Sequence, residues 1–159
     1  MTQSEYQNPI LCADYSDPDI VRVGDDFFMV SSSFNHMPAL PILHSTDLVN
    51  WTIINHVMDE LPLPGYDRYQ PGKGVWAPSI RWHDGKLWVC FSTPDEGIFI
   101  CHTEDPWGEW SAPHCLREAR GWIDPCPFWD DNGQAWLVHA FAHSRSGIKH
   151  KLQLFAMSP

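Results

Sequence analysis

A proline-led pattern of strand, tight turn and strand occurs three times along the chain, and this repeat constrains the fold more than any other feature. The copies begin at Pro18, Pro78 and Pro125, so they are about 60 and about 47 residues apart. In each copy an apolar run is followed by a short turn rich in Gly, Asp or Asn and by a second apolar run, which predicts an antiparallel hairpin. Repeats of this length built from short strands predict the blades of a β-propeller.

The first two copies continue into two further strands each, so that four antiparallel strands form one blade. Their registers agree, because His44-Ser45-Thr46-Asp47 corresponds to His102-Thr103-Glu104-Asp105 and a Trp follows in both. Only residues 116–120 suit a helical turn. The predicted strands are 20–23, 27–32, 41–45 and 51–54, then 78–82, 87–92, 97–102 and one that opens at 110–113, then 128–129, 135–139 and 151–156. The predicted blades cover about 10–58, 75–116 and 122–159.

The third copy has only three predicted strands, and three blades rarely close a propeller ring. The sequence therefore predicts an all-β chain that forms an incomplete, N-terminal portion of a propeller, about three blades in one domain over 1–159. The strand edges that this leaves exposed favour pairing with another chain, including a second copy of this one. The Pro- and Gly-rich loop 59–74 has a length that is typical of functional or mobile loops.

Composition excludes several classes of function. Of the 159 residues, 43% are hydrophobic and 19% are charged, as in globular domains, and the net charge of −10 argues against nucleic acid and anionic membranes as partners. No apolar run reaches the length of a membrane span. The five cysteines are odd in number and lack Cys-x-x-Cys spacing, so we expect neither a zinc site nor a disulfide framework. No other metal and no cofactor is expected. Residues 1–5 have no signal-peptide pattern, which predicts a cytoplasmic location unless a leader has been removed.

The residues that directly precede the three prolines are the best candidates for chemistry. These are Asp17, Ala77 and Asp124. Because innermost strands line the central channel of a propeller, we expect the three to converge at one end of it. Two carboxylates in an aromatic-rich pocket suit glycoside hydrolysis, and aromatic rings pack on the C–H faces of sugars. The alternatives remain that Asp-Pro pairs only form turns and that the aromatic residues only pack the core.

Five motifs in the same order resemble the family-43 glycoside hydrolases, and the β-xylosidase and α-L-arabinofuranosidase branch is the most similar. The motifs are Asn8-Pro9-Ile10, Ser16-Asp17-Pro18-Asp19-Ile20, Ser31-Ser32-Ser33-Phe34, His44-Ser45-Thr46-Asp47-Leu48-Val49-Asn50-Trp51 and Gly74-Val75-Trp76-Ala77-Pro78. The resemblance runs from about Asn8 to the end. It implies a five-bladed β-propeller, of which this chain holds part, and hydrolysis of xylo- or arabino-oligosaccharides with inversion.

The resemblance also implies roles for individual residues. Asp17 matches the general base, and Asp124 matches a second Asp that orients the general acid and raises its pKa, as a nearby like charge does. Phe34 and Trp76 match aromatic walls of the sugar subsite. Ala77 leaves room for the ring, and Ile123 stands where the family often has Phe.

The family's general acid, a Glu followed by a small residue and Pro, has no counterpart here. The glutamates are Glu5, Glu60, Glu96, Glu104, Glu109 and Glu118, and none has that context. An inverting hydrolase needs both carboxyl groups, roughly 6.5–9.5 Å apart. The chain is therefore predicted to be inactive or barely active by itself. The alternatives are a non-catalytic carbohydrate-binding fragment and a structural propeller fragment that needs a partner chain.

Other side chains are weaker candidates. Residues 130–133 resemble the start of a calcium loop but lack its later Glu, which favours a hairpin turn. His139 and His143 are four residues apart, but in a strand and a loop, so a shared metal is not expected. Two interpretations remain open for a further group of side chains: contact with the sugar, or simple solvent exposure. These are His36, Tyr66, Tyr69, Arg145 and Lys149.

Overall fold

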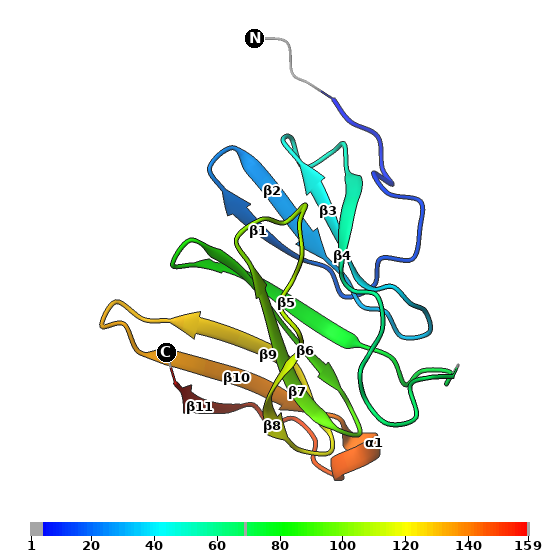
Figure 1. The fold of residues 1–159 in the computed structure, drawn as a ribbon, viewed down its shortest axis with the longest axis vertical. Coiled ribbons are helices and arrows are strands. Elements are labelled where there is room, and N and C mark those ends of the chain that lie inside the picture. Colours follow the sequence, from blue (N-terminus) through cyan, green and yellow to red (C-terminus); the bar gives the residue numbers. More distant parts are fainter. Residues whose placement is uncertain (1–4, 69, 159) are drawn as a thin grey trace.

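The computed structural model describes residues 5–68 and 70–158, which form three antiparallel sheets that follow one another along the chain (Figure 1). The first sheet contains β1 (Asp19–Val23), β2 (Asp26–Val30), β3 (Ala39–Ser45) and β4 (Thr52–Met58). The second contains β5 (Trp76–His83), β6 (Lys86–Thr93), β7 (Gly97–Thr103) and β8 (His114–Glu118). The third contains β9 (Trp122–Trp129), β10 (Ala135–Phe141) and β11 (Gln153–Met157). A four-residue helix, α1 (His143–Ser146), connects β10 and β11.

The predicted hairpins are confirmed. His83 pairs with Lys86 across the two-residue turn Asp84-Gly85, and both turn residues have positive φ, 48° and 73°. That backbone matches the twist of the flanking strands, and Asp-Gly is one of the sequences that adopts it most readily. Turn chemistry and apolar alternation were thus sufficient to place β5 and β6.

The outer strand of the second sheet differs from the prediction. A strand opening at 110–113 is wrong, and so is a helical turn at 116–120, because β8 occupies His114–Glu118 and pairs with β7. Before β8, Ser111 Oγ accepts a hydrogen bond from the His102 amide, and the Ser111 amide donates one to the His102 carbonyl. Pairing with β7 therefore overrides the helical preference of the Leu-Arg-Glu-Ala segment.

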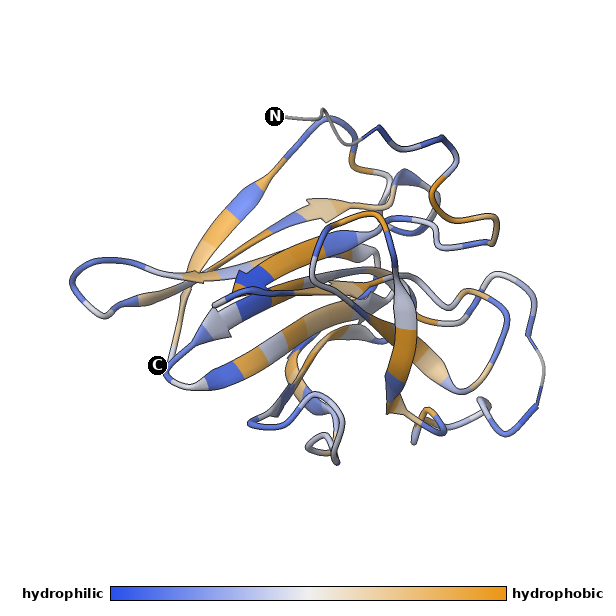
Figure 2. Cartoon of the chain, turned by 90° about the horizontal axis from the view of Figure 1, so that it is seen from above, coloured by the Kyte–Doolittle hydropathy of each residue, from blue (hydrophilic) through white to orange (hydrophobic). Residues whose placement is uncertain are grey.

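Two apolar layers hold the sheets together, and hydrophobic residues recur along the strands (Figure 2). The middle strand β6 serves both layers, because successive side chains point to opposite faces. Leu87, Val89 and Phe91 join the core shared with the first sheet, whereas Cys90 joins Leu137 in the core shared with the third. Complete burial of such side chains stabilises the fold by roughly 1.5–3 kcal/mol each.

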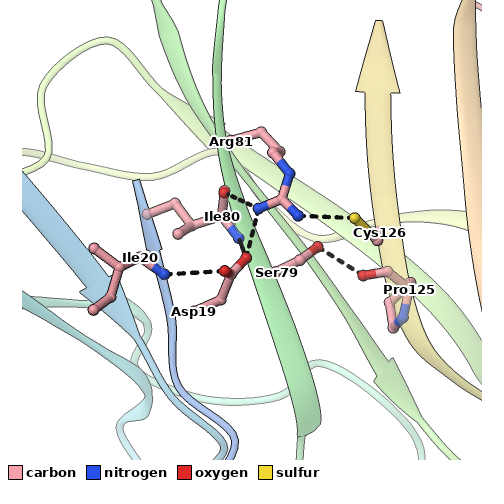
Figure 3. Close-up of polar contacts among 7 residues, drawn as sticks. All are labelled: Asp19, Ile20, Ser79, Ile80, Arg81, Pro125 and Cys126. Atoms are coloured by element: carbon pink, nitrogen blue, oxygen red, sulfur yellow. Dashed lines mark hydrogen bonds and ion pairs between the residues drawn. The ribbon is translucent and has the colours of Figure 1, made fainter. Parts of the chain in front are cut away.

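The inner strands β1, β5 and β9 lie side by side and are tied by polar contacts (Figures 1 and 3). The Asp19 carboxylate accepts hydrogen bonds from the Ile80 amide at 2.9 Å and from Arg81 Nη1 at 2.6 Å. Arg81 Nη2 reaches Cys126 Sγ of the third sheet at 2.8 Å. Asp19 and Arg81 therefore link three sheets, a role that nothing in the sequence indicated.

Within residues 5–68 and 70–158, no helix has the length and apolar character needed to cross a membrane.

Candidate active site

The same irregularity occurs at the start of the inner strand of each sheet. In β9, Ile123 pairs with Ala140 but Cys126 pairs with Val138, so two residues lie opposite one. The second sheet repeats this between the pairs Trp76–Ser92 and Ser79–Cys90. In the first sheet the Ser32 amide bonds the Ser16 carbonyl at 3.0 Å while Asp19 pairs with Val30. Each bulge contains one of the three residue pairs that end in proline: Asp17-Pro18, Ala77-Pro78 and Asp124-Pro125.

The two acidic residues in these bulges have strained backbones. Asp17 has φ of 50° and Asp124 has φ of 54°, in the left-handed region. A following proline disfavours helical conformations of the residue before it, and such non-Gly residues cost about 1–2 kcal/mol each. Ala77, at the equivalent place, is not among the described residues with positive φ. Strain of this kind is often found at functional sites, and among the three bulge positions it occurs at the two aspartates.

Asp17 is held by a neighbouring strand. Ser32 Oγ donates a hydrogen bond to Asp17 Oδ2 at 2.8 Å, and Ser32 is buried just beyond the end of β2. This contact fixes the carboxylate and leaves its second oxygen free for another partner. Ser32 was part of a predicted motif, but its contact with Asp17 was not foreseen.

Asp124 lies close enough to Asp17 to respond to its charge. Partial desolvation raises the pKa of Asp124, and the negative charge of Asp17 raises it further. Both effects disfavour the ionised form of Asp124. The two carboxylates, more than a hundred residues apart in the sequence, thus belong to one electrostatic site.

We predict that Asp124→Asn raises the unfolding midpoint at neutral pH. A raised native pKa means that ionised Asp124 costs folding free energy above that pKa, whereas below about pH 4 both states carry the proton and the cost vanishes. The gain over wild type should therefore shrink as thermal unfolding is measured from pH 7 down to about pH 4. Asp131→Asn, an exposed carboxylate in the β9–β10 turn, is the control. A gain that is equal at both pH values would contradict the electrostatic explanation.

The aromatic pair is brought together by a short bridge between two sheets. Ser33 and Val75 exchange two backbone hydrogen bonds of 2.9 Å, and Gly74 donates to the Phe34 carbonyl at 2.8 Å. A Cβ on Gly74 would lie 2.1 Å from the Ser33 carbonyl oxygen, so only glycine fits here. The bridge places the Phe34 and Trp76 rings edge to face, with centroids 5.7 Å apart.

Comparison with known proteins identifies the family to which this arrangement belongs. The profile of the glycosyl hydrolases family 43 matches residues 6–159. The chain belongs to this family. Similar family-43 proteins include a xylosidase/arabinosidase of Butyrivibrio fibrisolvens, 42% identical over 82% of this chain and 26% of that protein. A non-reducing end α-L-arabinofuranosidase of Bacteroides ovatus is 38% identical over 79% of this chain and 24% of that protein.

Solved family-43 structures have the same fold. A xylan β-1,4-xylosidase from Bacillus halodurans superposes with a TM-score of 0.80 and is 31% identical, covering 97% of this chain and 31% of its own. The all-β propeller fold expected for the family is thus confirmed. The chain spans about a quarter of the length of the curated family-43 relatives that it matches.

The structure brings most of the predicted site residues of this family-43 chain to one end of the inner strands. Asp17 and Asp124 interact, Phe34 contacts Trp76, Ala77 follows Trp76, and Ile123 precedes Asp124. Tyr69 lies outside the described residues, whereas His36 and Tyr66 line a small hollow of about 260 Å³ beside Phe34. The larger hollow, about 870 Å³, lies between the second and third sheets and includes neither aspartate.

Two weaker candidates take other roles. Asp130 Oδ1 accepts the amides of Asn132 and Gln134, so residues 130–133 form the predicted hairpin turn. Arg145 does not lie in a merely solvated loop, because it projects from α1 onto the Trp76 ring. No group of three or more His, Cys, Asp or Glu within residues 5–68 and 70–158 has an arrangement that could hold a metal ion.

Proposed function

We propose that this chain supplies the first blades and two of the three catalytic carboxyl groups of an inverting glycosidase that acts on xylo- or arabino-oligosaccharides. The observation that carries the proposal is the pairing of Asp17 and Asp124. Both occupy the same strained bulge position, and the negative charge of Asp17 contributes to the raised pKa of Asp124. The names of its relatives, which include xylosidases and arabinofuranosidases, support a pentose substrate.

In this proposal Asp17 is the general base. Its Oδ2 is held by the Ser32 hydroxyl, so the other carboxylate oxygen accepts a proton from the attacking water. Asp124 keeps a second negative charge near the proton donor, whose pKa it raises. Phe34 and Trp76 form the wall on which the sugar ring packs, and Ala77 and Ile123 shape the floor beside them.

The proton donor comes from outside residues 1–159. Inversion requires a carboxylic acid on the opposite side of the scissile bond from the base, and no glutamate here stands in a Glu-small-Pro context. We use "complete enzyme" for this chain together with the residues that supply the remaining blades, either in the same polypeptide or in a partner chain.

The test compares this chain with the complete enzyme. We expect no turnover of para-nitrophenyl β-D-xylopyranoside or α-L-arabinofuranoside by the purified 159-residue chain, and inverting hydrolysis of one of them by the complete enzyme. Turnover by the chain alone that is lost on Asp17→Asn would overturn the missing-acid proposal. A complete enzyme that binds xylo-oligosaccharides without hydrolysis would instead establish a carbohydrate-binding protein.

We further propose how the chain assembles and where it is located. The sheet edges, together with exposed Phe128 and Leu154 in the third sheet and exposed Leu152 just before β11, favour association with remaining blades or with a second copy. Native mass spectrometry can distinguish the two. All five cysteines are free thiols, which fits a reducing cytoplasm, and fractionation of the source cells tests that location.

A further inference from the structure

We propose that Arg145 is a positioning residue that holds the Trp76 wall in place from behind, and that it thereby sets the affinity of the sugar subsite. The inference rests on the proposed function, because it assumes that Trp76 contacts the sugar. It adds a residue from α1, the connection between two strands of the third sheet, to a subsite whose aromatic wall is formed by Phe34 and Trp76.

The first observation is the contact itself. The guanidinium carbon of Arg145 lies over the Trp76 ring, 5.2 Å from its centroid. A cation over an indole face is attracted by the ring quadrupole, and the attraction is stronger where water is excluded. The Arg145 side chain is only 23% exposed. An indole has two faces, and this contact occupies one of them.

The second observation is that Arg145 is itself anchored. Its Nε lies 3.7 Å from Asp95 Oδ1, and the Asp95 side chain is only 20% exposed. The adjacent Glu96 accepts a hydrogen bond from the Tyr66 hydroxyl at 2.8 Å. The β6–β7 turn therefore meets both Arg145 and the long loop that leads to Trp76.

The third observation is the fixed seat of α1, from which Arg145 projects. The Ala142 amide donates to the Gly121 carbonyl at 2.8 Å, just before the helix. A Cβ on Gly121 would lie 2.9 Å from the Ser146 Cβ and 3.1 Å from the Arg145 Cβ. The helix therefore packs directly on glycine backbone, which restricts where the Arg145 side chain can reach.

Two other contacts restrict the orientation of the Trp76 ring. Its Nε1 donates to the Gly72 carbonyl at 3.0 Å, and its ring meets Phe34. Gly72 lies in the long loop, and the Gly72 amide donates a hydrogen bond to Asn35 Oδ1 at 2.7 Å. Arg145 contacts Trp76 from α1, the connection between β10 and β11, so it couples the position of the wall to the sheet that carries Asp124.

The chain provides a matched control in Arg120. This arginine also binds Asp95, with Nε 3.3 Å from Oδ1, but its side chain is 70% exposed, whereas the cation over the Trp76 ring is that of Arg145. Arg120 and Arg145 thus share one carboxylate and differ in the contact with the indole. Replacing each by Met removes the same charge and keeps a similar apolar length.

The experiment measures kcat and KM of the complete enzyme on the nitrophenyl pentoside that it hydrolyses. We expect Arg145→Met to raise KM about tenfold with kcat within about threefold of wild type, because a displaced wall weakens binding of substrate and transition state alike. Arg120→Met should leave both constants within about twofold. Arg145→Lys should be intermediate, because an ammonium keeps the charge but not the planar stacking. If Arg145→Met folds poorly, Arg145→Lys against Arg120→Lys carries the same comparison.

A double-mutant cycle separates positioning from structure. Asp95→Asn should raise KM in the wild type but add nothing in the Arg145→Met background, because Asp95 acts on Trp76 only through Arg145. Additive effects, or equal KM values for Arg145→Met and Arg120→Met, would refute the inference. The Trp76→Ala variant tests whether Trp76 contacts the sugar at all. If this variant leaves KM unchanged, the proposed role of Trp76 is wrong, and the inference about Arg145 is wrong with it.

Discussion

Asp17→Asn in the complete enzyme is expected to lower kcat by about 10³-fold, because a general base contributes 10²–10⁴-fold and an amide cannot accept the proton of water. The substitution keeps the shape of the side chain, and its carbonyl oxygen can still accept the hydrogen bond from Ser32. KM should therefore change little. The measurement is steady-state hydrolysis of the nitrophenyl pentosides, from which kcat and KM are obtained separately.

Two neighbours serve as controls for this prediction. Asp14→Asn, an exposed carboxylate three residues earlier, should leave kcat within about threefold, because surface charges contribute little. Ser32→Ala should lower kcat about tenfold, since it frees the carboxylate without removing it. Equal losses from Asp14→Asn and Asp17→Asn would mean that the acidic turn acts as a whole and that Asp17 has no special role.

Asp19→Ala is expected to destabilise the propeller by about 2–4 kcal/mol, the largest effect on stability that we predict. Its carboxylate binds the Ile80 amide and Arg81, and the Asp19 and Arg81 side chains are 31% and 33% exposed. Removal of one partner leaves the Arg81 charge and a backbone donor unpaired. Partial exposure keeps the cost below that of a fully buried pair. Urea unfolding of the complete enzyme, followed by tryptophan fluorescence, measures the change.

The surface pair Arg22–Asp25 is the matched control, because it joins the same residue types at 3.5 Å with both side chains largely exposed. Asp25→Ala should cost no more than about 0.5 kcal/mol. Adding Arg81→Met to Asp19→Ala should recover part of the loss, since it removes the unpaired charge. If Asp19→Ala costs as little as Asp25→Ala, the tie between the inner strands does not stabilise the fold.

The sequence could predict those features that depend on neighbours along the chain. Asp84-Gly85 adopts the turn that its chemistry dictates, and the prolines at 18, 78 and 125 mark the inner strands. Side chains that meet across sheets could not be predicted in this way. In the segment Asp17-Pro18-Asp19, pattern and resemblance singled out Asp17, but only the register of β1 against β5 gives Asp19 its bond to Arg81.

The same limit applies at the site. The residues before the prolines were identified from spacing alone, because the bulge repeats in each sheet. The contact between Arg145 and Trp76 joins residues that are nearly seventy positions apart in the sequence. Arg145 makes it from a four-residue helix, which is too short to be predicted from hydrophobic periodicity. Residue 145 therefore remained one of several cations in a loop until its three-dimensional neighbours were known.

The repeated bulge has a consequence for how such a protein can change over evolutionary time. In these bulges two residues lie opposite one, so a bulge residue does not follow the inside–outside alternation of its strand. It can therefore be substituted without repacking either core. When a blade is duplicated, the copy inherits this unconstrained position on the same rim. This position is occupied by Asp17 in the first sheet, by Ala77 in the second and by Asp124 in the third. Single codon changes there can add or remove a charge at the channel mouth while the architecture is retained.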